Sequence, residues 1–445
     1  MRTLAGWGRT QPVVARVVTP ASEDDVATIL ADAAGPVIAR GLGRSYGDAA
    51  QAAGGTVVDG RGFGAVGTID HSTGSVTVGA GASIDAILAH AVPKGWFVPV
   101  SPGTRQVTVG GAIAADVHGK NHHRDGTFCQ HVTALRLVAP SGPRTVGPDD
   151  DPDVFWATAG GMGLTGIVTE ATVRLLPIET DRVLVDTDRC DDLDALLARM
   201  ATDQAYRYSV AWVDCMATGS SLGRGVLTRG DHARRDDLPA AERARPLAAP
   251  SPSRLRVPVP APRGLLNRLS VRAFNEAWFR RAPRERRGEL QPIGTFFHPL
   301  DFVTDWNLLY GPRGVVQYQL AVPSAAVEAV RRAIELLATS GVPSFLAVLK
   351  RFGPADPGPL SFPIEGWTLA LDIPVGPPRL PGVLDALDDL VQDVGGRVYL
   401  AKDARLDPAR LRAMYPRLGE LEAVRRRLDP NGILGSDLAR RLGIG

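Results

Sequence analysis

Two glycine-rich stretches carry residue types that could hold a large anionic cofactor with a ring system. The first is RGLGRSYGD at residues 40–48, and the second runs from Gly110-Gly111 to the block HGKNHH at residues 118–123. Glycines let backbone N–H groups approach a pyrophosphate, where successive amides form an anion-binding concavity, and nearby Arg and Lys add positive charge. The histidine and lysine of the second stretch can donate hydrogen bonds to a ring with several acceptors, such as the isoalloxazine of a flavin.

The sequence argues against two other kinds of nucleotide-binding motif. Residues 161–166, GMGLTG, match the spacing of a dinucleotide fingerprint, but such a fingerprint must open a helix. The residues that follow, 167–176, alternate between apolar and polar in the manner of a strand. A phosphate-binding Walker loop is absent as well, because Gly-Lys-Ser/Thr follows none of the glycine loops.

Four histidines, His118, His122, His123 and His131, also suggest a metal site. However, neither carboxylates at ligand spacing nor a His-Glu-x-x-His pattern accompanies them, and a zinc site needs three or four ligands. We therefore expect no bound metal. For His122, His123 and His131 a second interpretation stays open, in which the rings only fill a loop and hydrogen-bond within it.

Composition narrows the class of protein. Lys and Arg total 50 and Asp and Glu total 48, so the net charge of +2 creates no general field that would favour nucleic acid. Cys129, Cys190 and Cys215 show no Cys-x-x-Cys spacing, which predicts buried thiols rather than disulfides or a thiolate metal site. The length of 445 residues favours two domains, since it exceeds what one hydrophobic core usually serves.

The first residues, MRTLAGWGR, lack the apolar core and small-residue cleavage site of an export signal. No apolar run approaches the ~18 residues of a membrane-spanning helix. From these features we expect a cytoplasmic or peripherally membrane-associated protein.

The elements that must position the glycine loops follow an α+β pattern. Residues 13–176 alternate short β-branched runs with amphipathic helices, which we expect to begin after Ser22 and Ser83. Beyond Pro177 the pattern predicts the following elements: helices at 192–201, 325–337 and 382–394, and strands at 209–213, 315–322, 345–349, 367–373 and 398–401. This order favours a second domain whose sheet carries helices on one face.

Two polar segments interrupt that second domain. Residues 238–263 are rich in Pro and Arg, which predicts a mobile surface loop because Pro removes donors and blocks helix interiors. The basic run RRAPRERR, residues 280–287, follows Trp278-Phe279, and we expect a second mobile loop near 280–290. Two interpretations of the basic run stay open: a solvated linker, or a contact for phosphate headgroups or an anionic substrate.

The glycine blocks, together with residues 102–111, 155–166 and 399–403, closely resemble the decaprenylphosphoryl-β-D-ribose oxidases. These are the flavin subunits of an actinobacterial epimerase within the vanillyl-alcohol-oxidase superfamily. The resemblance implies an α+β, two-domain PCMH-type FAD-binding fold with a substrate (cap) domain built on a mainly antiparallel sheet flanked by helices. It also implies three segments: an FAD-binding domain at 1–178, the substrate domain at 179–396, and a segment at 397–445 that returns to the FAD domain.

The resemblance further implies which residues contact FAD. They are Ala39, Arg40, Gly41, Leu42, Gly43, Arg44, Ser45, Tyr46, Gly47, Asp48, Ala49, Gly103, Thr108, Val109, Gly110, Gly111, His118, Gly119, Lys120, Asn121, Ile167 and Tyr399. Many relatives attach the flavin to a histidine in the first loop, whereas this chain has Arg44-Ser45-Tyr46 there, so we expect non-covalent FAD.

The catalytic candidates that the resemblance implies are Lys402, His118, Tyr46, Gln319 and Lys350. We expect Lys402 to position substrate and stabilise charge, and a role as general base stays open because it requires a lowered pKa. Two positions depart from the family: Ala370 stands where relatives carry the cysteine that nitroaromatic inhibitors modify, and Thr368 stands where relatives often carry Asn.

The implied reaction is oxidation of the ribose 2-hydroxyl of decaprenylphosphoryl-β-D-ribose to the 2-keto sugar. This is the first half of epimerisation to the arabinose lipid for cell-wall arabinan synthesis. The expected partners are a polyprenyl-phosphate sugar, a separate NAD(P)H-dependent keto-reductase and a membrane surface, and the family has also been placed on the periplasmic face. Two alternatives stay open: an alditol or aldonolactone oxidase of the same superfamily, or a flavin-binding module without redox activity.

Overall fold

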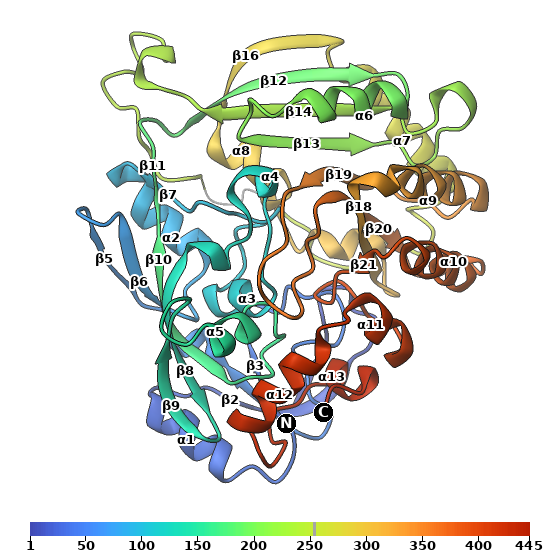
Figure 1. Ribbon diagram of the computed structural model, residues 1–445. Helices are drawn as coiled ribbons and strands as arrows, with labels where there is room; N and C mark the ends of the chain where they lie inside the picture. The colour runs from blue at the N-terminus through green and yellow to red at the C-terminus, as the bar shows by residue number, and fades with distance from the viewer. Residues whose placement is uncertain (252–254) are drawn as a thin grey trace.

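Three large sheets organise the protein, whose computed structural model describes residues 1–251 and 255–445 (Figure 1). The first sheet has the order β1-β2-β4-β3, and the second is antiparallel with the order β5-β6-β10-β8-β9. In chain order the strands of these two sheets are β1 (Arg2–Leu4), β2 (Val13–Val18), β3 (Val37–Arg40), β4 (Thr56–Asp59), β5 (Val66–Asp70), β6 (Ser75–Gly79), β8 (Val132–Ala139), β9 (Gly142–Val146) and β10 (Ile167–Arg174).

The third sheet has eight strands in the order β16-β12-β14-β13-β19-β20-β18-β21 and occupies the upper half of Figure 1. Its strands are β12 (Arg182–Cys190), β13 (Tyr208–Val213), β14 (Gly225–His232), β16 (Glu285–Pro292), β18 (Val315–Pro323), β19 (Leu346–Phe352), β20 (Gly366–Pro374) and β21 (Arg397–Val398). All of the neighbouring strands in it pair antiparallel. Two short pairs complete the strands: β7 (Trp96–Phe97) with β11 (Leu176–Pro177), and β15 (Leu255–Arg256) with β17 (Val303–Thr304).

The α-helices cover these sheets and connect their strands. They are α1 (Glu23–Ala31), α2 (Ile84–Ala91), α3 (Val109–Ala114), α4 (His122–Asp125), α5 (Pro152–Thr158), α6 (Leu193–Thr202), α7 (Arg268–Arg281), α8 (Ile293–Phe297), α9 (Val327–Ser340), α10 (Leu380–Asp393), α11 (Pro408–Met414), α12 (Leu418–Leu428) and α13 (Asp437–Leu442). The predicted helix starts are confirmed: the Ser22 side chain accepts from the Asp25 amide, and Ser83 caps α2 in the same way. The strand predicted after the Gly161–Gly166 loop is β10.

The two faces of the eight-stranded sheet differ in polarity. On β18 and β20 alternate residues point to opposite sides, so Gln317 and Gln319 share a face with Thr368 and Asp372. The other face carries Tyr318, Leu320, Leu369 and Leu371, all buried, and packs against α9 and α10. The apolar face therefore builds a core with the helices, which leaves a polar face directed toward the N-terminal sheets.

Three expectations about local structure were wrong. Residues 285–290, expected in a loop, belong to the edge strand β16, because Arg287 pairs with Asp188 of the neighbouring strand β12 at 2.7 Å. The β-branched run Val107-Thr108-Val109 predicts an extended segment before Gly110. This segment ends early, since Thr108 caps α3 and Val109 is already helical. The strand expected at 398–401 comprises only Arg397–Val398, because the backbone forms a turn that begins at Tyr399.

In the other predicted loop, 238–263, the described residues form no regular element except β15. Residues 252–254 of that loop lie outside the described residues. All three cysteines are free and buried, as predicted. Among residues 1–251 and 255–445, none of the helices has the length and hydropathy needed to cross a membrane.

The C-terminal segment joins the first sheet to the third. The amide of Val37 in β3 donates to the Ile433 carbonyl, and the amide of Tyr46 in the first glycine loop donates to the Ala401 carbonyl at 3.0 Å. Arg441 of α13 bridges Asp48 and Asp403, each at 2.8 Å. Figure 1 accordingly shows the red C-terminal helices beside the blue N-terminal strands. The glycine loop is therefore held from two sides by chain far away in sequence.

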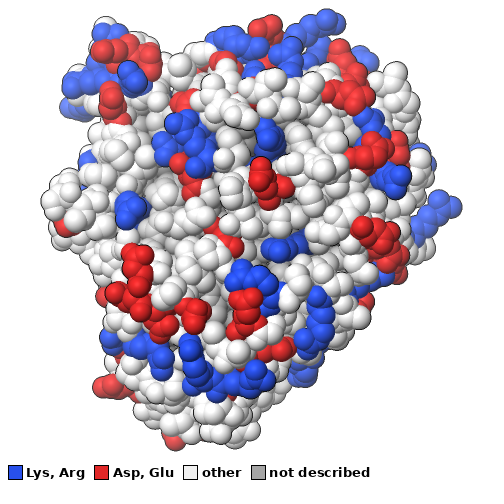
Figure 2. Space-filling model, viewed as in Figure 1, with Lys and Arg blue, Asp and Glu red and all other residues white. Residues whose placement is uncertain are grey.

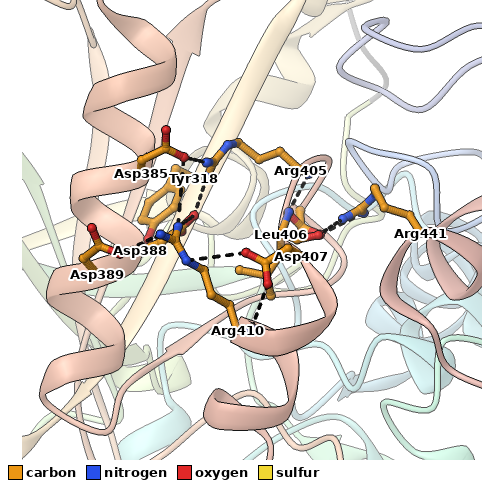
Figure 3. A network of polar contacts seen from close by, with 10 residues as sticks. Tyr318, Asp385, Asp388, Asp389, Arg405, Leu406, Asp407, Arg410 and Arg441 are labelled. Atoms are coloured by element: carbon orange, nitrogen blue, oxygen red, sulfur yellow. Dashed lines mark hydrogen bonds and ion pairs between the residues drawn. The ribbon is translucent and has the colours of Figure 1, made fainter.

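A buried carboxylate holds the same segment to α10 (Figure 3). The Asp388 side chain is 1% exposed, pairs with Arg410 at 3.0 Å and with Arg405, and accepts a hydrogen bond of 2.9 Å from the Tyr318 hydroxyl. Its neighbour Asp389 is 64% exposed and pairs with Arg410 at 2.6 Å. The two aspartates thus sit one residue apart in opposite environments.

We predict that Asp388→Asn lowers the free energy of unfolding by about 2–3 kcal/mol, because it leaves two arginines without their shared buried partner. Asp389→Asn is the matched control and should cost less than about 1 kcal/mol, since surface pairs contribute little. Urea unfolding of both variants, followed by circular dichroism, checks the difference. Equal costs would mean that the Asp388 network does not stabilise the fold.

Candidate active site

The first glycine loop presents unused backbone donors. Within the described residues, the amides of residues 42–45 make no hydrogen bond, whereas the Tyr46 amide is engaged. The loop is shaped by its arginines: Arg40 donates to the Ala5 carbonyl at 2.7 Å and to the Ala50 carbonyl at 3.0 Å. Arg44 donates to the Gln106 carbonyl at 3.0 Å and lies 3.9 Å above the Trp7 ring. A row of free amides beside a cation is the donor set that an anionic phosphate group requires.

The second glycine stretch lies directly against this loop. A Cβ added at Gly41 would stand 2.1 Å from the Thr108 hydroxyl, so only glycine allows this approach. The amides of Val109, Gly110 and Gly111 are already bonded, to Ala82, to Ala80 and to the Thr108 hydroxyl. The short helix α3 thus supports the loop, and the free amides belong to the loop itself.

Four predicted site residues meet on the polar face of the eight-stranded sheet. The Gln319 amide nitrogen of β18 lies 2.9 Å from His118 Nε2, and Lys350 Nζ of β19 lies 3.4 Å from His118 Nδ1. Gln319 also donates to the Thr368 hydroxyl at 3.0 Å. The His118 ring is 5.6 Å from the Tyr399 ring. Residues 118, 319, 350 and 399 therefore form one cluster, although they are distant in the sequence.

A second cluster contains Lys402 and Tyr46. Lys402 Nζ lies 4.5 Å from the centre of the Tyr46 ring, whose hydroxyl accepts a hydrogen bond of 3.1 Å from Gln317. Gln317 also donates to Asp372, which accepts a further bond of 3.2 Å from the Tyr310 hydroxyl. The two clusters adjoin, since Gln317 and Gln319 are alternate residues on the same face of β18.

Burial shifts the protonation of this site toward neutral groups. It lowers the pKa of Lys350 to about 7, with Lys402 contributing, and lowers the pKa of Lys402 to about 8 against the opposing charge of Asp372. Burial and the lysine charges hold the pKa of His118 well below its usual value. Burial raises the pKa of Asp372 to about 6. Near neutral pH the site thus combines a neutral imidazole with lysines that can gain or lose a proton.

Lys120 adds a third such group at the edge of the site. Burial, followed by the charge of Lys350, lowers its pKa to about 7, and its ammonium donates to the Phe296 carbonyl. The three other histidines considered for a metal site bond within their surroundings. His122 accepts from the Gly353 amide, His123 Nε2 lies 3.0 Å from the Tyr206 carbonyl, and His131 Nε2 lies 2.9 Å from the Asp125 carbonyl. Those three rings therefore have structural partners.

The other predicted contacts lie around the loop. Ile167 is buried at the start of β10 and packs in one apolar cluster with Val37. Asn121 is buried and donates to the Pro99 carbonyl at 2.9 Å. Gly103 is exposed, with open space where a Cβ would stand. Asp48 is paired with Arg441, so its carboxylate holds the loop in place.

Sequence reasoning missed Asp372, Gln317 and Tyr310. A signal existed for Gln317 and Asp372, because polar residues at alternate positions of an otherwise apolar strand indicate a buried polar face. Tyr310 lies in a short 3-10 helix and gave no such signal. The lysines offered a second signal. The chain has only four, at 94, 120, 350 and 402, against 46 arginines, and three of the four lie in this site. Arginine keeps its charge throughout the physiological pH range, so rare lysines in an arginine-rich chain are candidates for groups that titrate.

The residues present fit an FAD. The free amides of residues 42–45, beside Arg44, suit the pyrophosphate, and the absence of space at Gly41 keeps the loop backbone in place. His118, Lys402 and the amide side chain of Gln319 supply donors for a ring with several acceptors.

Comparison with known proteins agrees with this geometry. Residues 14–146 match the model of the FAD binding domain family, and residues 380–442 match that of the D-arabinono-1,4-lactone oxidase family. The chain is 43% identical to a decaprenylphosphoryl-β-D-ribose oxidase of Mycolicibacterium smegmatis, over 99% of this chain and 97% of that protein. It is 41% identical to an uncharacterised protein of Streptomyces coelicolor, over 79% of this chain and 97% of that protein.

More distant similarity extends to the lactone-oxidising enzymes. An L-gulono-1,4-lactone dehydrogenase of Mycobacterium tuberculosis is 24% identical over 96% of this chain and 95% of that protein. The whole-length similarity at 43% identity and the FAD-binding match over the glycine loops are decisive. The chain belongs to the decaprenylphosphoryl-β-D-ribose oxidase family and is an FAD-dependent oxidoreductase.

Proposed function

We propose that this enzyme oxidises the 2-hydroxyl of a polyprenylphosphoryl-β-D-ribose, such as the decaprenyl lipid, to the 2-keto sugar. The observation that carries the proposal is the polar face of the eight-stranded sheet, where His118, Lys350 and Lys402 surround Gln319 and Tyr46. Such a face offers both donors for sugar hydroxyls and positive charge for a phosphate. The substrate named for the Mycolicibacterium smegmatis relative has both features.

Bound FAD supplies the oxidant, by accepting a hydride from the carbon that carries the hydroxyl. We assign the chain's own residues supporting roles. Lys402 and Tyr46 orient the sugar, and the protonated Lys402 holds positive charge beside the site of hydride transfer. His118, which stays neutral at physiological pH, can hydrogen-bond the hydroxyl, and the neutral form of Lys350 can take up the hydroxyl proton or pass it to water.

We further propose that the FAD is held without a covalent bond and that the chain divides as its sheets do. Residues 1–178 and 397–445 would form the FAD-binding domain, because the C-terminal segment pairs with β3 and with the first glycine loop. Residues 179–396 would form the substrate domain, since seven of the eight strands of the third sheet lie in that range. Arg44-Ser45-Tyr46 in the loop contains no residue of the type that relatives use for covalent attachment.

The 2-keto sugar product indicates which enzyme must act next. A 2-keto sugar becomes the epimeric alcohol only when a reductase delivers a hydride to it, so we propose a separate NAD(P)H-dependent keto-reductase as the functional partner. The lipid part of the substrate also requires contact with a membrane surface, at the cytoplasmic or the periplasmic face.

A second candidate function is oxidation of a soluble alditol or aldonolactone. It is favoured by one observation, the match of residues 380–442 to the D-arabinono-1,4-lactone oxidase model. This range contains Lys402, so the C-terminal site residue is common to both substrate classes.

An anaerobic absorbance spectrum distinguishes these functions. Polyprenylphosphoryl ribose is added to the purified holoenzyme, and free alditols and aldonolactones are added to matched samples. Loss of the oxidised flavin band with the lipid alone supports the proposal. Loss with the soluble substrates alone would replace it with the second candidate, and a band that no sugar bleaches would indicate a redox-silent flavin protein.

Ala370 leads to a prediction about inhibition. It lies on the polar face of β20, opposite Gln319 in β18, where relatives carry the cysteine that nitroaromatic inhibitors modify. The wild-type protein should therefore form no covalent adduct with such compounds during turnover, and Ala370→Cys should form one. Intact-protein mass spectrometry measures the adduct. An adduct on the wild-type chain would show that another nucleophile reacts in its place.

A further inference from the structure

Exposed apolar side chains gather in one part of the chain. Among the described residues ten large apolar side chains are exposed, and eight of them fall between residues 255 and 309. These eight are Leu255, Val259, Leu265, Leu269, Phe274, Trp278, Phe302 and Leu309. Soluble surfaces rarely group large apolar side chains in this way without a binding partner.

The helix α7 carries the centre of this surface. Its buried side is a single stripe of Val271, Asn275 and Phe279, four residues apart. On its exposed sides Leu269 is 79% exposed, Phe274 46% and Trp278 47%, and the last two rings stack with centroids 6.1 Å apart. An aromatic pair exposed on the flank of a helix resembles the apolar face of an interfacial amphipathic helix.

The segment before α7 continues the surface. Residues 255–261 run beside residues 303–308, through the β15–β17 pair and the hydrogen bond from the Ala261 amide to the Leu308 carbonyl. Leu265 and Leu309 both line a cavity of about 290 Å³ at the start of α7. The exposed apolar residues of the two segments, 255–265 and 302–309, are therefore neighbours in space.

The stretch of chain that carries most of these apolar residues also has an excess of positive charge. Residues 255–287 contain nine arginines and two glutamates, with neither Lys nor Asp, whereas the whole chain has a net charge of only +2. Arg224 and Arg280 neutralise Glu276, the one acidic residue of α7. The face drawn in Figure 2 carries basic and acidic side chains close together.

Among the residues that the structure describes, five of these arginines have no acidic partner. Arg263, Arg268, Arg272, Arg281 and Arg284 are exposed, and within the described residues their side chains make neither an ion pair nor a hydrogen bond. Arginine side chains extend their apolar stems over neighbouring hydrophobic surface while their guanidinium groups reach for phosphate. The surface thus combines apolar anchors with free cations that match anionic phosphate groups.

We propose that α7 and the 255–269 segment bind the surface of an anionic lipid bilayer, with Phe274 and Trp278 entering the headgroup region. Exposed aromatic anchors and unpaired arginines together match a bilayer's apolar interior and negative surface. The cavity at the start of α7 adds a connection to the site, because Tyr310 forms part of its wall and donates to Asp372. That connection to lipid turnover rests on the proposed function, whereas the binding surface does not.

Vesicle sedimentation of the holoenzyme tests the proposal. Wild type should bind vesicles of phosphatidylcholine containing about 30 mol% phosphatidylglycerol far better than pure phosphatidylcholine, and high salt should weaken the binding. The double variant Phe274→Ser/Trp278→Ser should lower the partition coefficient about tenfold. The triple variant Arg272→Gln/Arg281→Gln/Arg284→Gln should lower it about fivefold for each arginine removed. Retained FAD absorbance in each variant shows that it is folded.

Matched controls are Arg332→Gln, an exposed arginine on α9, and Val14→Ser, an exposed apolar residue on β2; both should bind as wild type does. Failure of the wild type to bind anionic vesicles, or equal binding by all variants, would overturn the proposal. If the wild type is a dimer in sedimentation equilibrium and Phe274→Ser/Trp278→Ser dissociates it, the surface binds a second copy of the chain instead.

A separate activity measurement distinguishes this proposal from the proposed function. Flavin bleaching by a short-chain, water-soluble polyprenylphosphoryl ribose should be the same in all variants. Its absence in the wild type would refute the proposed function and leave the vesicle result standing.

Discussion

Replacement of Lys402 by methionine is expected to lower the rate constant for reduction of the bound FAD by about 10²- to 10³-fold, without loss of the cofactor. Lys402 Nζ lies 4.5 Å from the Tyr46 ring and within the field of Asp372, in the part of the site where β18, β20 and the first loop meet. Methionine keeps the length of the side chain and removes the charge. Stopped-flow absorbance with the lipid substrate measures the rate constant.

The pH dependence of the same rate constant separates the two roles open to Lys402. Burial lowers its pKa to about 8, so it is protonated below that pH and becomes neutral above it. If its charge stabilises the reaction, the rate falls as pH rises through about 8, and Lys402→Arg removes the fall because arginine stays charged. A rate that instead rises through this range, and is abolished in Lys402→Arg, would show that the neutral amine acts as a base.

The control for this experiment is Lys94→Met, since Lys94 is exposed and is the one lysine outside the site. It should reduce FAD at the wild-type rate. Equal rates for Lys402→Met and the wild type would remove Lys402 from the reaction.

The second large effect is expected from Gly41→Ala, which should weaken FAD binding by about 10- to 100-fold. The new Cβ would stand 2.1 Å from the Thr108 hydroxyl and 2.9 Å from its methyl carbon, so either the first loop or the start of α3 must move. Movement of the loop displaces the free amides of residues 42–45 from the positions that suit a pyrophosphate. Flavin fluorescence during titration of the apoprotein gives the dissociation constant.

Gly35→Ala serves as the matched control, because a Cβ at Gly35 meets no atom within 4 Å. Its affinity for FAD should equal that of the wild type. Unchanged FAD binding in Gly41→Ala would mean that the contact with Thr108 adapts without cost, and that the loop does not depend on this glycine.

Much of the fold could be predicted because its signals are local. Ser22 and Ser83 mark helix starts through hydrogen bonds to amides three residues later, and the alternation after Gly166 marks a strand, so nearby residues alone carry the information. The expectation of a loop at 285–290 was wrong because the deciding contacts are distant in the sequence. A run of arginines predicts a solvated loop, but here carboxylates of β12 compensate its charge, and those partners are about a hundred residues away.

The sequence by itself determined the family, the FAD cofactor and the residue types of the site, because these depend on short motifs such as residues 40–48 and 118–123 and on similarity along the whole chain. The tertiary structure alone decided which side chains meet. His118, Gln319 and Lys350 become neighbours only when β18 and β19 pair with β20 and this sheet packs over the second glycine stretch. The lowered pKa of Lys402 likewise depends on burial by several distant segments. Burial and long-range pairing are properties of the packed chain, so local sequence could name these residues but could not set their distances or their protonation.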